Sequence, residues 1–369
     1  MQLTVERGNF QAFFETPFNA YPGTSAYVSP LKSDLARFLD PHKNPLFDNE
    51  DQISWFTVHR NGRAVGRITA HCHSASNRLY GWRRAYFGFF DCVEDAEVAR
   101  TLLTEAENWA RHRGFDEILG NFNLTAMQQI GVVTSGFDKA PYTDLVWNPP
   151  HVPKFLAANG YHAEFPMTTF EVDLAKTEAP ELGSKQQAIL EDPDYSFLPI
   201  SRWNVRKRME QARQLLNVAF AANPMFVPVS SEEFHFQAKD MAWIVDPRIS
   251  ALLTWRGEPI ATILCVPDLN PFLTKVGSCS SFTAPWHFLT HKLSNKRAVL
   301  IFSAVRPDMQ GKGVNPLVLR RVILAMKAAG YEKLGNTWIG DENRASLAQK
   351  EKAGATRLHR LHLFRKSLS

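Results

Sequence analysis

The chain has 369 residues, of which 44% are hydrophobic and 21% charged, an ordinary globular composition that excludes a largely disordered protein. Its length suggests two or three domains. No apolar run approaches the roughly 20 residues that span a bilayer, and the first ten residues lack a signal-peptide pattern. The four cysteines are scattered without a C-x-x-C pair, so a disulfide scaffold and a zinc ribbon are excluded. We therefore expect a cytoplasmic protein.

The net charge of +5 is divided unevenly between the two halves of the chain. Residues 1–175 carry 15 basic and 20 acidic side chains, whereas residues 176–369 carry 27 basic and 17 acidic side chains. The second half, with a net charge of +10, favours an anionic partner. On charge alone a nucleotide cofactor, an anionic membrane surface and RNA all qualify.

The first half predicts a β-hairpin, a strand, a helix, a strand and a helix, in that order. The hairpin turn contains Asn61 followed by Gly62, which is the strongest short turn signal, and Gly114 ends the first helix. The expected segments are 53–59 and 64–71 for the hairpin, then 85–90, 95–113, 117–122 and 152–158.

The second half predicts the same order of elements after an opening helix. The expected segments are 203–220, 249–255, 260–266, 298–305, 316–329, 333–339, 343–353 and 356–365. Between the halves, residues 176–199 contain three prolines and few apolar side chains, and we interpret them as a linker with a short helix at 186–190. The sequence therefore predicts two copies of one mixed α/β domain, over 1–175 and 200–369.

The most informative segment is a buried strand that leads through a glycine-containing loop into a long helix. Gly311 and Gly313 let the backbone approach a ligand closely, and the N–H groups at the start of a helix bind anions. Lys312 adds positive charge, as do Arg306 and the Arg320–Arg321 pair. The loop matches neither the mononucleotide nor the dinucleotide glycine motif. A simple turn before a helix is the alternative.

This segment and those after it resemble the GNAT superfamily of acyl-CoA N-acyltransferases. Residues 310–313, Gln-Gly-Lys-Gly, match the pyrophosphate loop of that family, and Asn343 matches its Asn after the fifth strand. Gly354 and Ala355 match its closing pair. Landmarks in both halves extend the resemblance over nearly the whole chain, to a bacterial family of tandem-GNAT proteins that includes proteins similar to ceramide synthases.

Two positions depart from the family pattern. Asn315 stands where the loop has a last Gly or Ala, and Lys350 stands at about the place of the Tyr that often acts as general acid. The first departure is mild. The second leaves the proton for the leaving thiolate without an assigned donor.

The resemblance implies an acyl-CoA-dependent N-acyltransferase in which an amine attacks the thioester directly. The co-substrate would be acyl-CoA or acetyl-CoA, with a long fatty acyl group among the candidates and no metal. The domain over 200–369 would bind it, whereas the domain over 1–175 would be a degenerate copy, because residues 91–95 hold no glycine and three carboxylates. The expected cofactor contacts are Ala304, Val305, Gln310, Gly311, Lys312, Gly313, Val314 and Asn343.

Acyl transfer needs a base for the amine and a donor to the developing oxyanion. Asp341 and Glu342 are the candidate bases, since a buried carboxylate with a raised pKa accepts protons. Their alternative role is to complement the positive end of the following helix. The backbone N–H of Ala304 or Val305 is the candidate oxyanion donor, and Ser303 is a weaker catalytic candidate.

The acceptor is expected to be a small-molecule or lipid amine, with Asn123, Asn148, Trp338 and Trp286 as substrate contacts. Residues 121–125 and 135–150 of the first domain should wall off the acyl or acceptor cleft. Residues 279–297 mix aromatic and basic side chains, which is typical of a membrane interface or a lipid tunnel entrance. A core-packing loop with a solvated basic end is the alternative. Peripheral contact with the inner face of a membrane is therefore left open.

Two other function classes remain at this stage. Fem-type aminoacyl-tRNA-dependent peptidyl transferases also carry two GNAT-like domains, and the basic second half could bind RNA. A non-catalytic CoA or lipid sensor would explain Lys350 in place of the Tyr. Retention of residues 310–313 favours CoA over nucleic acid. The scattered histidines lack the companions that a metal site requires.

Overall fold

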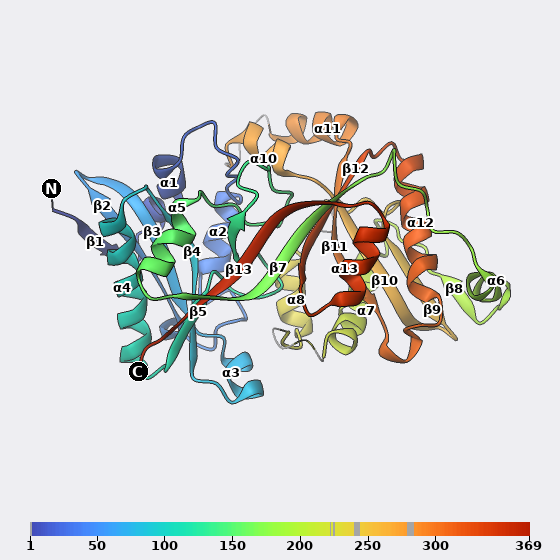
Figure 1. Cartoon of the computed structure of the whole chain (residues 1–369), viewed down its shortest axis with the longest axis horizontal. Helices are drawn as coiled ribbons and strands as arrows, with labels where there is room; N and C mark the ends of the chain where they lie inside the picture. Colours follow the sequence, from blue (N-terminus) through green and yellow to red (C-terminus); the bar gives the residue numbers. More distant parts are fainter. Residues whose placement is uncertain (1, 222, 224–225, 240–243, 279–283) are drawn as a thin grey trace.

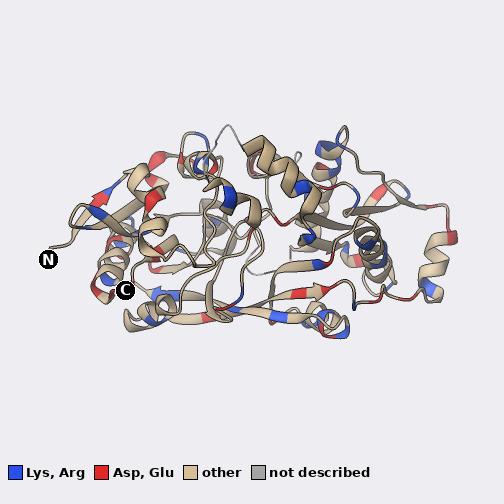
Figure 2. Cartoon of the chain, turned by 90° about the horizontal axis from the view of Figure 1, so that it is seen from above, with Lys and Arg blue, Asp and Glu red and all other residues tan. Residues whose placement is uncertain are grey.

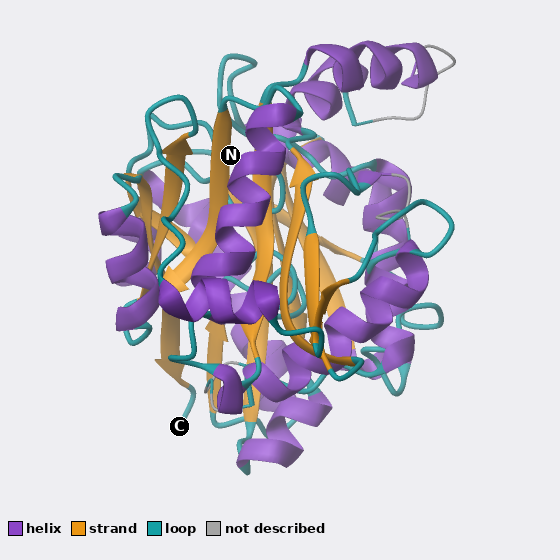
Figure 3. Cartoon of the chain, turned by 90° about the vertical axis from the view of Figure 1, so that its right-hand side faces the viewer, coloured by secondary structure: helices purple, strands orange, loops and turns teal. Residues whose placement is uncertain are grey.

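The computed structural model describes residues 2–221, 223, 226–239, 244–278 and 284–369. Their strands form one long mixed sheet with helices on both faces (Figures 1 and 3). The strand order along the sheet is β1-β2-β3-β4-β5-β13-β7-β12-β11-β10-β9-β8, and β6 pairs with β13 beside this path. No helix within the described ranges is long and apolar enough to cross a membrane.

The first half of the sequence provides the left side of the molecule in Figure 1. Its strands are β1 (Thr4–Arg7), β2 (Ile53–Arg60), β3 (Arg63–His71), β4 (Arg84–Cys92), β5 (Glu117–Gly120), β6 (Val132–Ser135) and β7 (His162–Asp173). Its helices are α1 (Phe10–Ala20), α2 (Lys32–Leu39), α3 (Ser74–Tyr80), α4 (Ala96–His112) and α5 (His151–Ala158). Asp95 caps α4 by accepting hydrogen bonds from the N–H groups of Glu97 and Val98.

The second half provides the right side. Its strands are β8 (Tyr195–Phe197), β9 (Ala251–Trp255), β10 (Glu258–Pro267), β11 (Arg297–Val305), β12 (Lys333–Gly340) and β13 (Thr356–Ser367). Its helices are α6 (Ser184–Glu191), α7 (Val205–Ala219), α8 (Ser231–Gln237), α10 (Asn270–Val276), α11 (Ala284–Ser294), α12 (Val314–Ala328) and α13 (Arg344–Lys352). Both halves contain the predicted mixed α/β arrangement.

The two halves share their central strands. β13 pairs with β5 and β6 on one side and with β7 on the other, and β7 in turn pairs with β12. Figure 1 shows β13, in dark red, crossing from the right side into the left side, where the chain ends. The last strand of the sequence therefore completes the sheet of the first half.

Apolar clusters fill both faces of each half. In the first half α4 packs on one face and α1 and α2 pack on the other. In the second half α12 covers one face, whereas α7 and α8 cover the other together with Tyr142 and Leu145 from the first half. Basic and acidic residues are interspersed along both halves in the view of Figure 2.

Every predicted helix and strand is present, with ends that differ by a few residues. The segment interpreted as a linker is more structured than expected, because it contains α6, the predicted short helix, and β8, which pairs with β9. The twelve-residue β7 was not predicted from the sequence, since Pro166 interrupts it. The division into domains over 1–175 and 200–369 stays a prediction.

Candidate functional site

The strands β11 and β12 separate before they end. They pair in parallel over residues 297–300 and 333–336, and β12 then continues along β7 alone. Ile301 is an extra residue in β11, since Leu264 of β10 lies opposite Phe302 while the next residue, Cys265, lies opposite Leu300. The bulge and the separation open a gap beside residues 301–305.

The far end of β11 leads directly into the predicted phosphate loop. Gly311 and Gly313 have φ angles of 73° and 89°, in the left-handed region that favours glycine. Within the described part of the chain, the backbone N–H groups of residues 311–315 donate to no acceptor. These donors lie at the positive end of the 15-residue helix α12. The loop can therefore bind a diphosphate.

Helix α6 rests on this loop. The ammonium of Lys185 donates to the carbonyl of Gly311, and the amide of Gln186 donates to the carbonyl of Gly313, both at 3.1 Å. These bonds use carbonyl groups and leave the N–H groups of the loop open. Lys185 therefore adds positive charge beside the exposed Lys312, a contribution that sequence reasoning missed because 126 residues separate Lys185 from Gly311.

The arginines expected near the loop are engaged elsewhere. Arg306 forms a bidentate ion pair with Asp308, at 2.6 and 2.9 Å. Arg320 donates to the carbonyl of Pro180, and the guanidinium of Arg321 lies over the ring of Phe197. The lysines therefore provide the accessible positive charge of the loop.

The other predicted cofactor residues lie around the gap and the loop. Gln310 is exposed and donates weakly to the carbonyl of Val305, at 3.5 Å. Ala304 and Val314 are buried in the core. Asn343 caps α13, since its side-chain oxygen accepts from the N–H of Ser346 at 3.1 Å. The cofactor roles of these residues stay predictions.

The two candidate bases are not buried carboxylates. Asp341 forms a bidentate ion pair with Arg360 of β13, one bond being 2.6 Å long, and this guanidinium lowers the pKa of Asp341 instead of raising it. Glu342 and Ser303 are exposed. Their catalytic roles stay predictions, and Asp341 lacks the raised pKa that motivated its assignment.

Lys350 is a buried amine in α13, with 7% of its surface exposed. Burial lowers its pKa from 10.5 to about 8, and within the described residues no carboxylate pairs with it. Cys265 of β10 is close enough to influence its charge, and the adjacent Gln349 accepts a hydrogen bond from Asn315 at the phosphate loop. A lysine with this pKa can donate a proton to a thiolate, whose own pKa is about 8.5.

A cavity of about 240 Å³ lies between the two halves, next to the gap. Its wall contains Ile301 and Phe302 from β11 and residues at and after α8. The first half contributes residues of α2, of β4 and of its loops. Its lining is mostly apolar and consists of Pro30, Leu35, Phe38, Phe89, Asn123, Met127, Gln128, Gln129, Thr143, Asp144, Phe234, Gln237, Ala238, Ile244, Val266, Leu269, Ile301 and Phe302. Loops of the first half thus line a cleft that reaches β11, and its role as the acyl or acceptor cleft stays a prediction.

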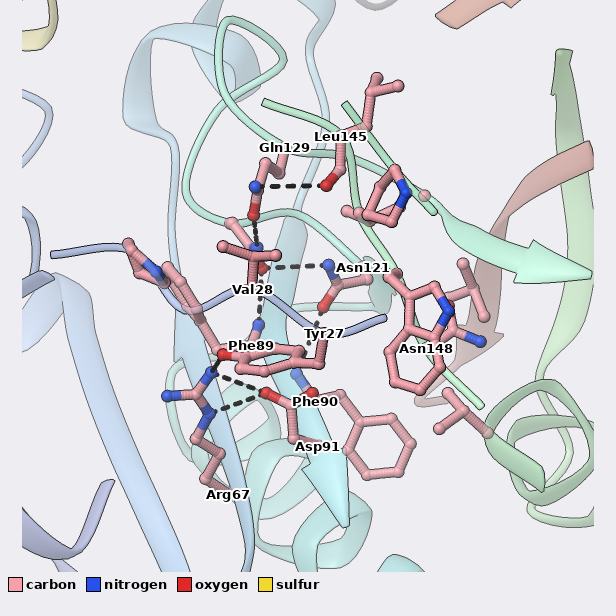
Figure 4. A pocket seen from close by; sticks show the side chains of 18 of the residues that line it. Tyr27, Val28, Arg67, Phe89, Phe90, Asp91, Asn121, Gln129, Leu145 and Asn148 are labelled. Atoms are coloured by element: carbon pink, nitrogen blue, oxygen red, sulfur yellow. Dashed lines mark hydrogen bonds and ion pairs between the residues drawn. The ribbon is translucent and has the colours of Figure 1, made fainter. Parts of the chain in front are cut away.

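A smaller, polar pocket of about 50 Å³ lies at the corresponding place in the first half (Figure 4). The side-chain oxygens of Asn123 and Asn121 accept from the backbone N–H groups of Phe89 and Phe90, at 2.7 and 3.3 Å. Arg67, which is 1% exposed, forms an ion pair with Asp91 at 2.7 Å below them. These two backbone donors of β4 are therefore already occupied within the protein.

The predicted substrate contacts have different positions. Asn123 lines the large cavity as well as the polar pocket. Asn148 lines the polar pocket alone and bonds to both the N–H and the carbonyl of Val133. Trp338 packs edge-to-face against Phe165, with 5.9 Å between ring centroids. Asn123 thus shares the large cavity with Ile301 and Phe302 of β11, while the substrate role of each predicted contact stays a prediction.

Residues 279–283 of the predicted aromatic and basic segment lie outside the described residues, and the rest forms α11 with its flanks. Phe288 packs edge-to-face against Phe272 of α10. Trp286, on another face of α11, is 67% exposed, and Leu289 and Leu293 are also largely exposed. Contact with a membrane stays a prediction, and so does the cytoplasmic location.

If α11 contacts lipid, vesicles that contain anionic phospholipid should shift tryptophan emission to shorter wavelength. The shift should be absent in Trp286→Phe, which lacks the tryptophan of α11 but keeps all the others. In the wild type the shift should weaken with salt, because salt screens the attraction to anionic lipid. Emission that is unchanged with every vesicle composition would favour the packing role of this segment.

No group of three His, Cys, Asp or Glu side chains within the described ranges is arranged to hold a metal ion. His71 is buried, which lowers its pKa to about 3, and its ring nitrogen lies 3.0 Å from the carbonyl oxygen of Leu124.

No protein-family model matches the chain. Protein YghO of Escherichia coli K12 is 24% identical over an alignment of 376 positions, which covers 99% of this chain and 94% of YghO. Bacterial ceramide synthase of Caulobacter vibrioides is 22% identical over 351 residues, which cover 93% of this chain and 90% of that protein.

Among solved structures, a tandem GNAT protein from the clavulanic acid biosynthesis pathway superposes with a TM-score of 0.57 at 12% identity, covering 100% of this chain and 99% of its own. A GCN5-related N-acetyltransferase from Sphaerobacter thermophilus gives 0.53 at 12% identity, with 99% and 96% covered. The chain therefore has the tandem GNAT fold and is a distant homologue, along nearly its full length, of YghO and of bacterial ceramide synthase.

Proposed function

We propose that this protein is an acyl-CoA-dependent N-acyltransferase that transfers an acyl group from CoA to an amine. One strand carries the proposal, because β11 joins the three parts that such a reaction needs. Its bulge at Ile301 lines the apolar cavity, its free edge faces the gap, and its end leads into the open phosphate loop. A CoA diphosphate on the loop would direct the thioester along the gap toward the cavity.

In this reaction the neutral amine attacks the thioester carbonyl carbon, a C–N bond forms and the C–S bond breaks. The thiolate takes a proton from the ammonium of Lys350. The attacking nitrogen, which is positively charged after the C–N bond forms, then gives one proton to the neutral Lys350 and restores its ammonium form. The sum of ammonium and thioester is an amide, a free thiol and one proton. The assignment of Lys350 fills the place of the missing Tyr and thereby removes the reason for a non-catalytic sensor.

We further propose a lipid amine acceptor and a long acyl chain. The apolar lining of the cavity supports a chain-like substrate, because such surfaces bind hydrocarbon favourably. The distant homologue from Caulobacter vibrioides, which is named a bacterial ceramide synthase, points the same way. The open loop favours CoA over the tRNA of a peptidyl transferase.

The first half should bind no CoA, so each chain should bind one acyl-CoA molecule. The free edge of β4 is occupied by Asn121 and Asn123, and Asp95 already caps α4. Native mass spectrometry with a panel of acyl-CoAs tests both the function and this stoichiometry. We expect one molecule per chain, and preference among chain lengths identifies the donor. Two equivalent molecules per chain, or none from the whole panel, would contradict the proposal.

A further inference from the structure

The cavity between the halves contains one titratable group among the described residues that line it, namely Asp144. Its carboxylate has no hydrogen bond or ion pair with any residue that the structure describes. Desolvation alone raises its pKa to about 7, and no other charged group of the described chain contributes to the shift. Asp144 is half-buried and lies in the wall of the cavity.

The neighbours of Asp144 fix its position. Thr143 bonds to the buried Asp268 of the second half through its N–H and its hydroxyl, at 3.0 and 2.9 Å. Tyr142 and Leu145 are buried in the core of that half. Asp144 itself has a φ of 67°, in the left-handed region that Asp and Asn tolerate. The loop therefore holds the carboxylate at the cavity wall.

An ionised carboxylate fixed in an apolar cavity is costly unless a cation pairs with it, and without a cation it takes up a proton more readily. An acyl chain or a thioester carries no cation, whereas an amine acceptor does in its ammonium form. Apolar cavities of about 150 Å³ already stay dry and bind guests the size of benzene, so this larger one is suited to hydrocarbon. Aliphatic amines combine both features, because their ammonium form carries a cation on a hydrocarbon chain.

We infer that this cavity binds the acceptor, a primary amine on an aliphatic chain, with the ammonium at Asp144 and the chain against the apolar wall. The inference rests on the proposed function and names its substrate class. Because Ile301 and Phe302 line the same cavity, the nitrogen lies beside the gap where the thioester arrives. Asp144 accepts one proton from the ammonium, which leaves the neutral amine for attack, and that proton passes to solvent after the amide leaves.

Calorimetric titration with dodecylamine and with dodecanol tests the assignment. At pH 8 the wild type should bind the amine about 10–100-fold more tightly than the alcohol, the effect of a charge-assisted hydrogen bond. Asp144→Asn should bind both alike. The preference of the wild type should shrink as the pH falls through 7, because the carboxyl group becomes protonated. An unchanged preference in Asp144→Asn would overturn the inference.

Two further variants control for folding and for position. Asp138→Asn removes an exposed carboxylate of the same loop, which pairs with Lys139, and should keep the full preference. In Ala238→Phe the larger side chain fills part of the cavity from the end of α8. This variant should therefore no longer bind dodecylamine but should still bind the shorter butylamine. Asparagine tolerates the positive φ of residue 144, so the main variant should fold.

Acyl-CoA binding is measured on the same proteins. Wild type that binds acyl-CoA but shows no preference for the amine overturns this inference alone. Wild type that prefers the amine through Asp144 but binds no acyl-CoA supports the amine site and overturns the proposed function.

Discussion

Replacement of Lys350 with methionine should lower kcat by about 10²–10⁴-fold, the usual cost of losing a general acid, while acyl-CoA affinity stays nearly unchanged. The reason is its burial in α13 with a pKa of about 8, which suits proton delivery to a thiolate. Wild-type kcat should fall above about pH 8, since the acid must be protonated. Steady-state kinetics across pH 6–10, at roughly half-unit steps, measure this profile.

Two variants of α13 make this test specific. Lys352→Met removes an exposed lysine two residues away and should leave kcat and its pH profile unchanged. Lys350→Tyr should recover part of the rate and move the alkaline fall toward the ordinary pKa of tyrosine, about 10. A wild-type alkaline limb that persists in Lys350→Met would exclude Lys350 as the acid.

The same methionine variant should be more stable than the wild type at neutral pH. The folded-state pKa of Lys350 lies below that of the unfolded chain, so at pH 7 the buried ammonium destabilises the fold. Each pKa unit corresponds to about 1.4 kcal/mol, and the cost disappears as the pH rises from about 8 toward 10.5. A gain in stability with a loss of turnover would separate a catalytic role from a structural one.

The substitution Gly311→Glu should abolish acyl-CoA binding, with a loss of at least about 100-fold. The loop offers its backbone N–H groups at this point, and a carboxylate there repels the diphosphate. A Cβ at Gly311 meets no atom within 4 Å, so the loss would come from blocked binding and not from a clash. Gly313 is less suitable, because a Cβ there would meet Gln186 and Lys185 of α6.

Gly257→Glu is the matched control. Gly257 has a φ of 84° and open space around it, like Gly311, but it lies in the turn between β9 and β10. Both variants should lose similar stability in thermal unfolding, and Gly257→Glu alone should retain acyl-CoA affinity in calorimetry. Retained affinity in Gly311→Glu would remove the phosphate-loop assignment.

Local signals in the sequence were sufficient for most of the strands but only half of the described helices, since α1, α2, α3, α8, α10 and α11 were not predicted. Turn residues such as Asn61 and Gly62, and the periodicity of α4 and α12, are properties of neighbouring residues, and the structure confirms the segments that they predict. The mixed α/β fold and its duplication followed from their order. The position of β13 did not, because strand partners far apart in sequence leave no local pattern.

Much of the candidate site depends on contacts that no motif encodes. Asp144 is a candidate because it lines a cavity that residues of both halves form. In the sequence it is one aspartate in a loop, with no local signal. Lys185 reaches Gly311 across 126 residues, and Arg360 changes the expected pKa of Asp341 from another strand. Charge partners and desolvation are thus set by tertiary structure.

The position of β13 also determines when the protein can fold during synthesis. The first half emerges from the ribosome long before residues 356–367 exist, yet its sheet lacks a central partner for β5 and β7 until they arrive. Early folding must therefore stop with unpaired strand edges exposed, a state prone to wrong pairing and aggregation. Pairing β13 with β5, across the 235 residues that separate the two strands, is a slow, non-local step. Completion of the first half consequently waits for synthesis of residues 356–367, so a chain truncated before them is left with an open N-terminal half.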